Sequence, residues 1–83
     1  MTFLVIPPQP VEVRLGADAR PAYLRGGPLV GELEAVAHWR AELDWWDRPV
    51  DRDYWKVLLE GRLLCELYHD RAEDAWFVER VFD

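Results

Sequence analysis

The chain contains few residues that could perform chemistry. Its reactive side chains are a single cysteine, Cys65, and two histidines, His38 and His69, beside 16 carboxylates. Serine is absent and Thr2 is the only threonine, which essentially excludes a hydroxyl nucleophile of the Ser-His-Asp type. The five glycines form neither a GxGxxG nor a GxxxxGK loop for phosphates. The residue types therefore point to a non-enzymatic protein.

The same residues give weak support for a metal site. Asp51 and Asp53 would share one face of a strand, so a divalent cation is conceivable, but no further ligand stands at a suitable spacing. An Arg-carboxylate network is the more ordinary role for such a pair. His38 and His69 have no cysteine partner in a recognisable motif, so no four-ligand zinc set can be assembled. We expect no metal and no cofactor, and an enzyme built on carboxylates and histidine stays open as an alternative.

Aromatic and arginine side chains gather between residues 45 and 55, and they are the best candidates for a binding function. Tryptophan, tyrosine and arginine dominate the hot spots of protein interfaces. We therefore predict a candidate interaction surface that is formed by Trp46, Arg48, Arg52 and Tyr54. Trp45 and Trp46 would point to opposite faces of a strand, with Trp45 in the core and Trp46 outward. The competing role for Trp46 is to cover the edge of the core.

The segment that leads into this cluster, Gly31 to Trp46, alternates apolar and polar residues. One face would carry Leu33, Ala35, Ala37, Trp39, Ala41, Leu43 and Trp45, and the other Glu32, Glu34, His38, Arg40, Glu42 and Asp44. Only Val36 breaks the alternation, and a period of two is what a half-buried strand requires. A strand of this length must bend, and Gly31 or the alanines are plausible places. Because Ala, Glu, Leu and Arg favour helices, a helix at residues 32-46 stays open as the alternative.

The remaining segments predict a meander of short strands. They are Pro10–Leu15, Arg20–Arg25, Asp53–Glu60, Leu63–His69 and Ala75–Phe82. The tight connection at residues 60-62 predicts an antiparallel hairpin, and Cys65 falls in phase with its apolar neighbours, which places it in the core. In the last strand, Trp76, Val78 and Phe82 would share a face. The expected fold class is mainly β, a single small antiparallel sheet of five or six strands, for which a half-barrel is one arrangement.

Length and charge restrict the organisation and the partners. Eighty-three residues suffice for one domain, which we place at residues 10-83 after an N-terminal strand or tail at residues 1-9. The net charge is −6 and the basic residues are scattered, so nucleic-acid binding as a free-standing domain is not expected. The apolar run Phe3–Ile6 is too short for a membrane span. A lone cysteine suits a reducing cytoplasm, and the composition is typical of a thermophilic or GC-rich source.

Four motifs carry a resemblance to a known family. They are Trp45-Trp46, Arg-Asp-Tyr-Trp-Lys-Val at residues 52–57, Leu-Tyr-His-Asp at 67–70, and Trp-Phe-Val-Glu-Arg-Val-Phe-Asp at 76–83. In this order they resemble a small bacterial domain family of unknown function. That family occurs as free-standing short proteins and, in related form, at the extreme C-terminus of ImuB-like Y-family polymerase homologues. Residues 10–13 and Arg20-Pro21 also fit the free-standing members, so the resemblance covers roughly residues 10 to 83.

The resemblance implies an accessory role rather than catalysis. The sequence contains neither the polymerase body nor its acidic metal ligands. What it implies is a protein-interaction module linked to translesion synthesis and DNA damage tolerance, with a polymerase-cassette component as partner. A small β-barrel nucleic-acid binder that stacks bases on Trp and Tyr is the first alternative. A homodimer formed through the apolar edge Phe3–Ile6 also stays open.

Overall fold

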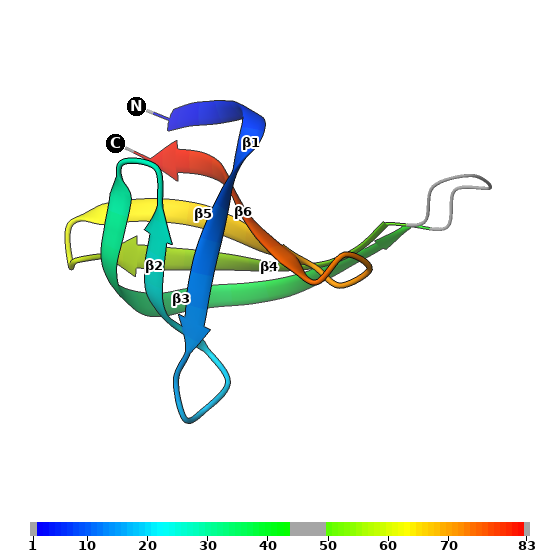
Figure 1. Ribbon diagram of the computed structural model, residues 1–83, viewed down its shortest axis with the longest axis horizontal. Helices are drawn as coiled ribbons and strands as arrows, with labels where there is room; N and C mark the ends of the chain where they lie inside the picture. Colours follow the sequence, from blue (N-terminus) through cyan, green and yellow to red (C-terminus); the bar gives the residue numbers. More distant parts are fainter. Residues whose placement is uncertain (1, 44–49, 83) are drawn as a thin grey trace.

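The computed structural model describes residues 2–43 and 50–82, which form one sheet of six β-strands (Figure 1). The strands are β1 (Thr2–Leu15), β2 (Pro21–Gly26), β3 (Leu29–Leu43), β4 (Val50–Leu59), β5 (Leu63–Asp70) and β6 (Ala75–Phe82). The predicted fold class is confirmed. The alternative of a helix at residues 32-46 is wrong for the described part, because residues 32–43 belong to β3. No helix in these two described ranges is long and apolar enough to cross a membrane.

The sheet closes into a ring, because the first strand pairs with the last. Every neighbouring pair is antiparallel, and β1 divides its length between two neighbours. Residues 2–4 and 9–11 pair with β6, whereas residues 12–15 pair with β2. The N-terminal segment and the expected strand at residues 10–15 are therefore one element, and the sheet curls further than a half-barrel.

The β4–β5 hairpin is the most regular part of the ring. Its ladder runs without interruption from Leu59 opposite Leu63 to Arg52 opposite Asp70. The turn has positive φ angles at residues 60 and 61, 52° and 67°, as a type I′ turn requires. Glycine at position 61 adopts this conformation without steric cost. The hairpin predicted from residues 60–62 is confirmed.

The core fills the inside of the ring. Its buried members are Leu24, Val57, Leu59, Cys65, Leu67 and Val78. In β4 and β5 these are every second residue, as the alternation of side chains along a strand dictates. Cys65 is a free cysteine with no exposed surface, so its predicted place in the core is confirmed.

A bulge in β3 reverses the faces that the sequence predicts. The register against β4 shifts between Ala35 and Ala37, which leaves Val36 as the extra residue. Leu33 and Ala35 face the inside of the ring, but after the bulge His38 takes the inner side and Trp39 the outer. The expectation that Trp39 shares a face with Leu33 is therefore wrong. Val36, the one residue that breaks the alternation, marks the position of the reversal.

A second bulge, in β6, also reverses which side chains face the inside of the ring. Val78 lies opposite Leu67 and Arg80 opposite Glu66, so Glu79 is the extra residue. Beyond it Val81 packs against the core, while Phe82 lies on the outer side. The prediction that Phe82 shares a face with Val78 is wrong for this reason.

One edge of β3 has no neighbouring strand over most of its length. β2 pairs only with residues 29–32 of β3, whereas β4 follows β3 from residue 33 to residue 43. Figure 1 shows β3 and β4 running out together past the end of β2. On the side away from β4, residues 33–43 therefore have no backbone partner among the described strands; we call this side the free edge of β3.

Candidate functional site

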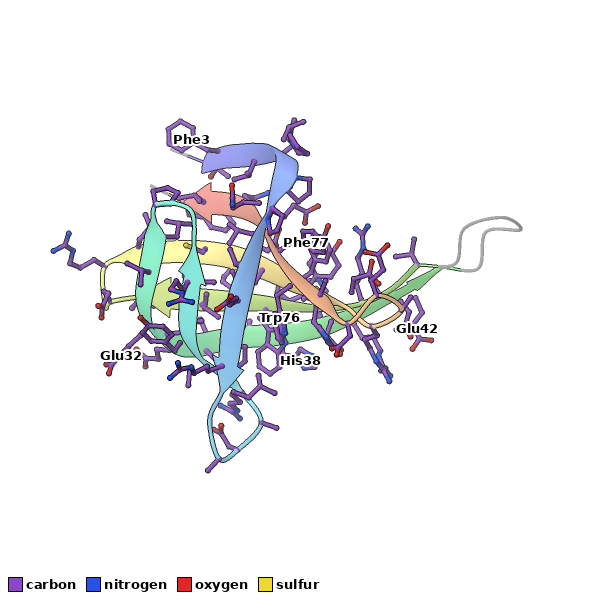
Figure 2. The ribbon with its side chains drawn as sticks, viewed as in Figure 1. Phe3, Glu32, His38, Glu42, Trp76 and Phe77 are labelled. Atoms are coloured by element: carbon purple, nitrogen blue, oxygen red, sulfur yellow. The ribbon has the colours of Figure 1, made fainter. Side chains whose placement is uncertain are left out.

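The outer face of the sheet carries a row of four aromatic side chains, one from each of β3 to β6. The aromatic row consists of Trp39, Tyr54, Tyr68 and Phe77, which lie directly opposite one another in the strand register. Successive ring centroids are 5.6, 5.5 and 5.1 Å apart, distances at which aromatic pairs attract. Figure 2 shows Phe77 and its chain neighbour Trp76 on opposite sides of β6. The row thus lies on the outer side of the sheet, on the face away from the core cluster.

The aromatic row is buried at its centre and exposed at its end. Tyr68 is 4% exposed, whereas Trp39 is 39% exposed and belongs to the strand with the free edge. The two rings at this end, Trp39 and Tyr54, are nearly parallel, with an interplanar angle of 5°. A large indole held in a fixed orientation beside an unpaired strand edge is a suitable anchor for another protein.

Arg52 lies over the middle of the aromatic row. Its guanidinium carbon is 4.3 Å from the centre of the Tyr68 ring, and its Nη1 donates a hydrogen bond of 3.3 Å to the Tyr54 hydroxyl. Burial lowers the pKa of Arg52, but the hydrogen bond to Tyr54 and the nearby Tyr68 and Asp70 outweigh it, so the pKa is raised. Arg52 is therefore a permanent cation with its planar group fixed on an aromatic surface.

Two of the four predicted interaction residues belong to this surface. Arg52 and Tyr54 contact each other directly. Trp46 and Arg48 lie outside the described residues, as does Trp45. Residue type and spacing did not identify the other members of the aromatic row, Trp39, Tyr68 and Phe77. Tyr68 could have been identified from the sequence. Tyr54 and Tyr68 are equally far in sequence from the turn glycine at position 61, so they must pair in a regular hairpin.

The inner side of β3 and β4 carries an ionic cluster. It consists of His38, Arg40, Asp51, Asp53 and Arg71. The Nε2 atom of His38 is 3.2 Å from Asp53 Oδ1, and the Nε atom of Arg40 is 3.6 Å from the same oxygen. Asp51 Oδ1 is 3.9 Å from Arg40 and 3.8 Å from Arg71. Asp51 and Asp53 thus take part in an Arg-carboxylate network, whose arginines are Arg40 and Arg71.

Each histidine stacks on a tryptophan of the neighbouring strand. The ring centroids of His38 and Trp55 are 4.1 Å apart, and those of His69 and Trp76 are 4.7 Å apart. The Nε2 atom of His69 is 2.8 Å from Asp74 Oδ1. A histidine paired with a carboxylate could act as a general base, but nucleophilic catalysis also requires a nucleophile beside the histidine. These contacts hold the histidines as structural members of the sheet.

The cysteine does not supply that nucleophile. Cys65 has no exposed surface, and burial raises the pKa of its thiol, so the reactive thiolate is disfavoured. Across the described ranges, no three His, Cys, Asp or Glu side chains are close enough to hold a metal ion. Several of the titratable groups in this part of the chain instead form pairs between neighbouring strands, such as His38 with Asp53 and Arg25 with Glu12.

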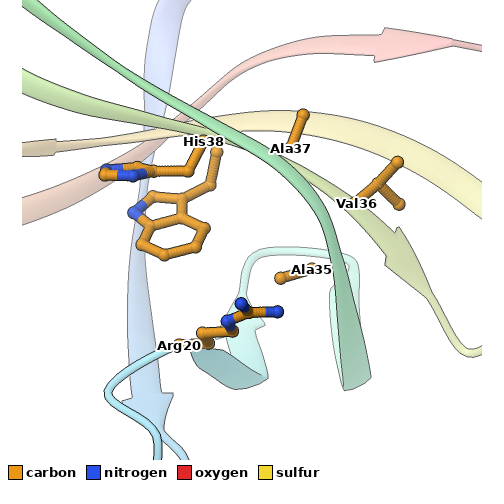
Figure 3. Close-up of a pocket in the computed structure, with 6 residues that line it drawn as sticks. Arg20, Ala35, Val36, Ala37 and His38 are labelled. Carbon is orange, nitrogen blue, oxygen red and sulfur yellow. The ribbon is translucent and has the colours of Figure 1, made fainter.

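A small cavity lies beside the bulge of β3 (Figure 3). Its volume is about 210 Å³, and its lining residues are Arg20, Ala35, Val36, Ala37, His38 and Trp55. Figure 3 shows Arg20 and His38 reaching it from different elements, the β1–β2 turn and β3. Pockets for small ligands usually exceed about 300 Å³. This cavity is smaller than such a pocket, whereas a second hollow, between the β2–β3 turn and the β4–β5 turn, measures about 530 Å³.

Comparison with known proteins adds no relative, because no family model, no curated protein and no solved structure matches the chain. The resemblance to the ImuB-related domain family thus stays a prediction from the sequence motifs. The aromatic row, Arg52 and the free edge of β3 are the features of the described structure that bear on function.

Proposed function

We propose that this protein is a non-enzymatic interaction module that binds a protein partner through the exposed end of the aromatic row and Arg52. The observation that carries the proposal is the placement of four aromatic rings on the outer side of the sheet, ending in the 39% exposed Trp39. A domain of this size needs its aromatic residues inside to gain stability. Aromatic rings that lie on the outer face of the sheet therefore favour a role in recognition.

The chemistry of the surface fits a protein partner. Trp39 offers a broad apolar contact, Tyr54 an apolar ring with a hydroxyl, and Arg52 a planar group for carboxylates or carbonyl oxygens. Charged side chains flank these residues on the same face of the sheet, since Lys56 lies two residues along β4 from Tyr54 and Asp70 lies opposite Arg52. An apolar anchor inside a polar rim is the usual anatomy of a reversible interface. The motif resemblance adds a component of a translesion polymerase cassette as the first partner to test.

The experiment is a comparison of matched single variants. Tagged protein captures partners from an extract of its native cells, and each partner identified is purified and titrated against the wild type, Trp39→Ala and Phe3→Ala. Phe3 is 48% exposed but lies on β1, away from the aromatic row, so it controls for the loss of any exposed aromatic. Trp39→Ala should weaken binding by about thirtyfold or more, which is about 2 kcal/mol, and Phe3→Ala should leave it unchanged.

The folded state of each variant is checked by circular dichroism and urea unfolding. Trp39→Phe, which keeps a ring at this position, should recover part of the affinity. Equal affinity of the wild type and a folded Trp39→Ala variant for every captured partner contradicts the proposal. Loss of binding only in Phe3→Ala would also contradict the proposal and would place the interface on β1.

A further inference from the structure

The free edge of β3 exposes backbone groups that can pair with another strand. In an antiparallel ladder every second residue directs its N–H and C=O to a given edge, and these groups are unpaired where no neighbour follows. Beyond residue 32 this holds for β3 on the side away from β4, within the part of the chain that the structure describes. Exposed strand edges are the sites at which sheets add strands from other molecules.

The side chains of this edge decide which strand can be added. Arg40 and Glu42 stand on the same face of β3, two residues apart, with 44% and 62% of their side chains exposed. The residue between them is the small Ala41. Arg40 directs its Nε toward Asp51 and Asp53 of its own sheet, and its Nη1 is 3.4 Å from Glu42 Oε1 without hydrogen-bond geometry. A guanidinium group has five N–H donors, so Arg40 keeps donors for a further carboxylate, and Glu42 keeps acceptor capacity for a further cation.

We propose that a second copy of the chain adds to the free edge of β3, antiparallel, about a two-fold axis that passes beside Ala41. In this register Arg40 of each copy lies opposite Glu42 of the other, which gives two equivalent ion pairs. The smallest of the side chains involved lies on the axis, where the two copies approach most closely. Directly opposite residues of opposite charge stabilise an antiparallel pair, and like charges destabilise it.

The charge pattern excludes the neighbouring registers. An axis beside Arg40 would place two arginines opposite each other, and an axis beside Glu42 would do the same with two glutamates. An axis beside Trp39 would set Arg40 against His38 of the second copy. Of these four positions only Ala41 gives opposite charges across the axis. Charged edge residues ordinarily prevent strand addition, but this pair permits it in one register.

This inference goes beyond the proposed function, because it concerns the backbone edge and not the aromatic anchor. A dimer of this kind would join two sheets into one continuous surface, so that each aromatic row ends at a shared border. The Arg40 and Glu42 charges and the Trp39 ring lie on opposite faces of the strand. Variants at Glu42 therefore test the dimer without removing the proposed binding residues.

The register is tested by disulfide trapping. Ala41→Cys should form a covalent dimer under mild oxidation, because directly opposite Cβ atoms lie about 4.5–5.5 Å apart, close enough for a disulfide. Ala37→Cys is the matched control: it lies on the same face of β3, but its counterpart would be about 26 Å away along the strands. Cys65 stays in both variants, since it has no exposed surface. Trapping should be on the order of tenfold faster for Ala41→Cys.

The charge pair is tested by sedimentation equilibrium up to millimolar protein concentration. Glu42→Arg creates two like-charge contacts across the axis, so the dissociation constant of the dimer should rise by about tenfold or more. The inference is overturned by a wild type that stays monomeric, or by equal trapping of Ala41→Cys and Ala37→Cys. It is also overturned if the dimer is insensitive to Glu42→Arg and disappears in Ile6→Lys, because the interface would then be the N-terminal edge.

Discussion

Two buried residues show how the sheet controls the ionisation of single side chains. Cys65 lies in the core without exposed surface, and Tyr68 lies under Arg52 with 4% of its surface exposed. Burial raises the pKa of the Cys65 thiol above its ordinary value of 9.0. Burial likewise raises the pKa of the Tyr68 hydroxyl above 10.0, although the Arg52 charge opposes this shift. Both groups are thus kept neutral in the folded protein at a pH where they would ionise in the unfolded chain.

We therefore predict that the protein loses stability in alkali. Since both pKa values are raised on folding, the stabilising contribution is complete below the unfolded pKa values and is lost as pH rises above about 9. The free energy of unfolding should fall by at most about 1.4 kcal/mol per pH unit for each group. Urea unfolding at several pH values between about 7 and 10 measures this decline.

Cys65→Ala provides the control for this prediction. Without the thiol, the decline should begin only near the ordinary pKa of tyrosine, so the curves of variant and wild type should diverge between pH 9.0 and 10.0. A wild type whose stability is constant over this range would show that neither group is held neutral by the fold. The native thiol should also react slowly with Ellman's reagent at any pH that preserves the fold.

At the scale of the elements, the alternation of apolar and polar residues predicted the strands correctly. It did not predict correctly which side chains share a face of the sheet. Residues 31–43 alternate well enough to decide for a strand over a helix, and the structure confirms that choice. Val36 breaks the alternation at the position of the bulge, but one apolar residue out of phase fits an exposed side chain in a regular strand equally well. Ala35 and Ala37 tolerate either face, so only the pairing with β4 decides that Val36 is an inserted residue and that the faces reverse beyond it.

The candidate surface was predictable from the sequence only where a short turn determines which residues of two consecutive strands pair. Arg52 and Tyr54 stand out by residue type, and the turn at residues 60–62 fixes the partner of Tyr54 in the next strand. Trp39 and Phe77 join the aromatic row through β3 and β6, each of which contains a bulge. Their faces follow from the closed ring as a whole, so residue type alone could not assign them to the surface.

A deletion tests whether the bulge at Val36 is an insertion in an otherwise regular ladder. Removal of Val36, whose side chain is 57% exposed, leaves Ala35 and Ala37 consecutive and preserves every recorded pair between β3 and β4. The variant should fold, with a loss of no more than about 1 kcal/mol in the free energy of unfolding. Tryptophan fluorescence during urea unfolding gives this value.

Deletion of Leu58 serves as the comparison, because it removes a residue from the uninterrupted β4–β5 ladder. One half of β4 would then present its core side chains to solvent, and we expect no cooperative unfolding transition. If removal of Val36 is equally damaging, the bulge is required to bend β3 into the ring, and the reversal of faces is a condition of closure.

At the scale of the whole molecule, most of the described cations have a carboxylate or an aromatic ring beside them. Arg20, Arg25, Arg40, Arg71 and Arg80 each have a carboxylate within 4.0 Å. Arg14, Arg52 and Lys56 lie over aromatic rings. The chain as a whole carries a net charge of −6. A groove that follows a phosphate backbone needs cations gathered on one side and free to exchange counterions, and the described part of the chain distributes them instead.

We therefore predict that the aromatic row does not bind single-stranded nucleic acid, although stacked rings on a sheet are used for that purpose elsewhere. Trp39 stacks on Tyr54 and Tyr68 stacks on Phe77, while Tyr54 is tilted by 41° against Tyr68, so these rings already use part of their π faces on one another. Fluorescence anisotropy of a labelled oligothymidylate should show no saturable change at physiological salt. Lowering the salt should add little, because repulsion from a net charge of −6 grows as screening weakens. Saturable binding that weakens with added salt and is lost in Trp39→Ala would instead make this surface a nucleic-acid platform, and the protein partner would have to be sought on another face.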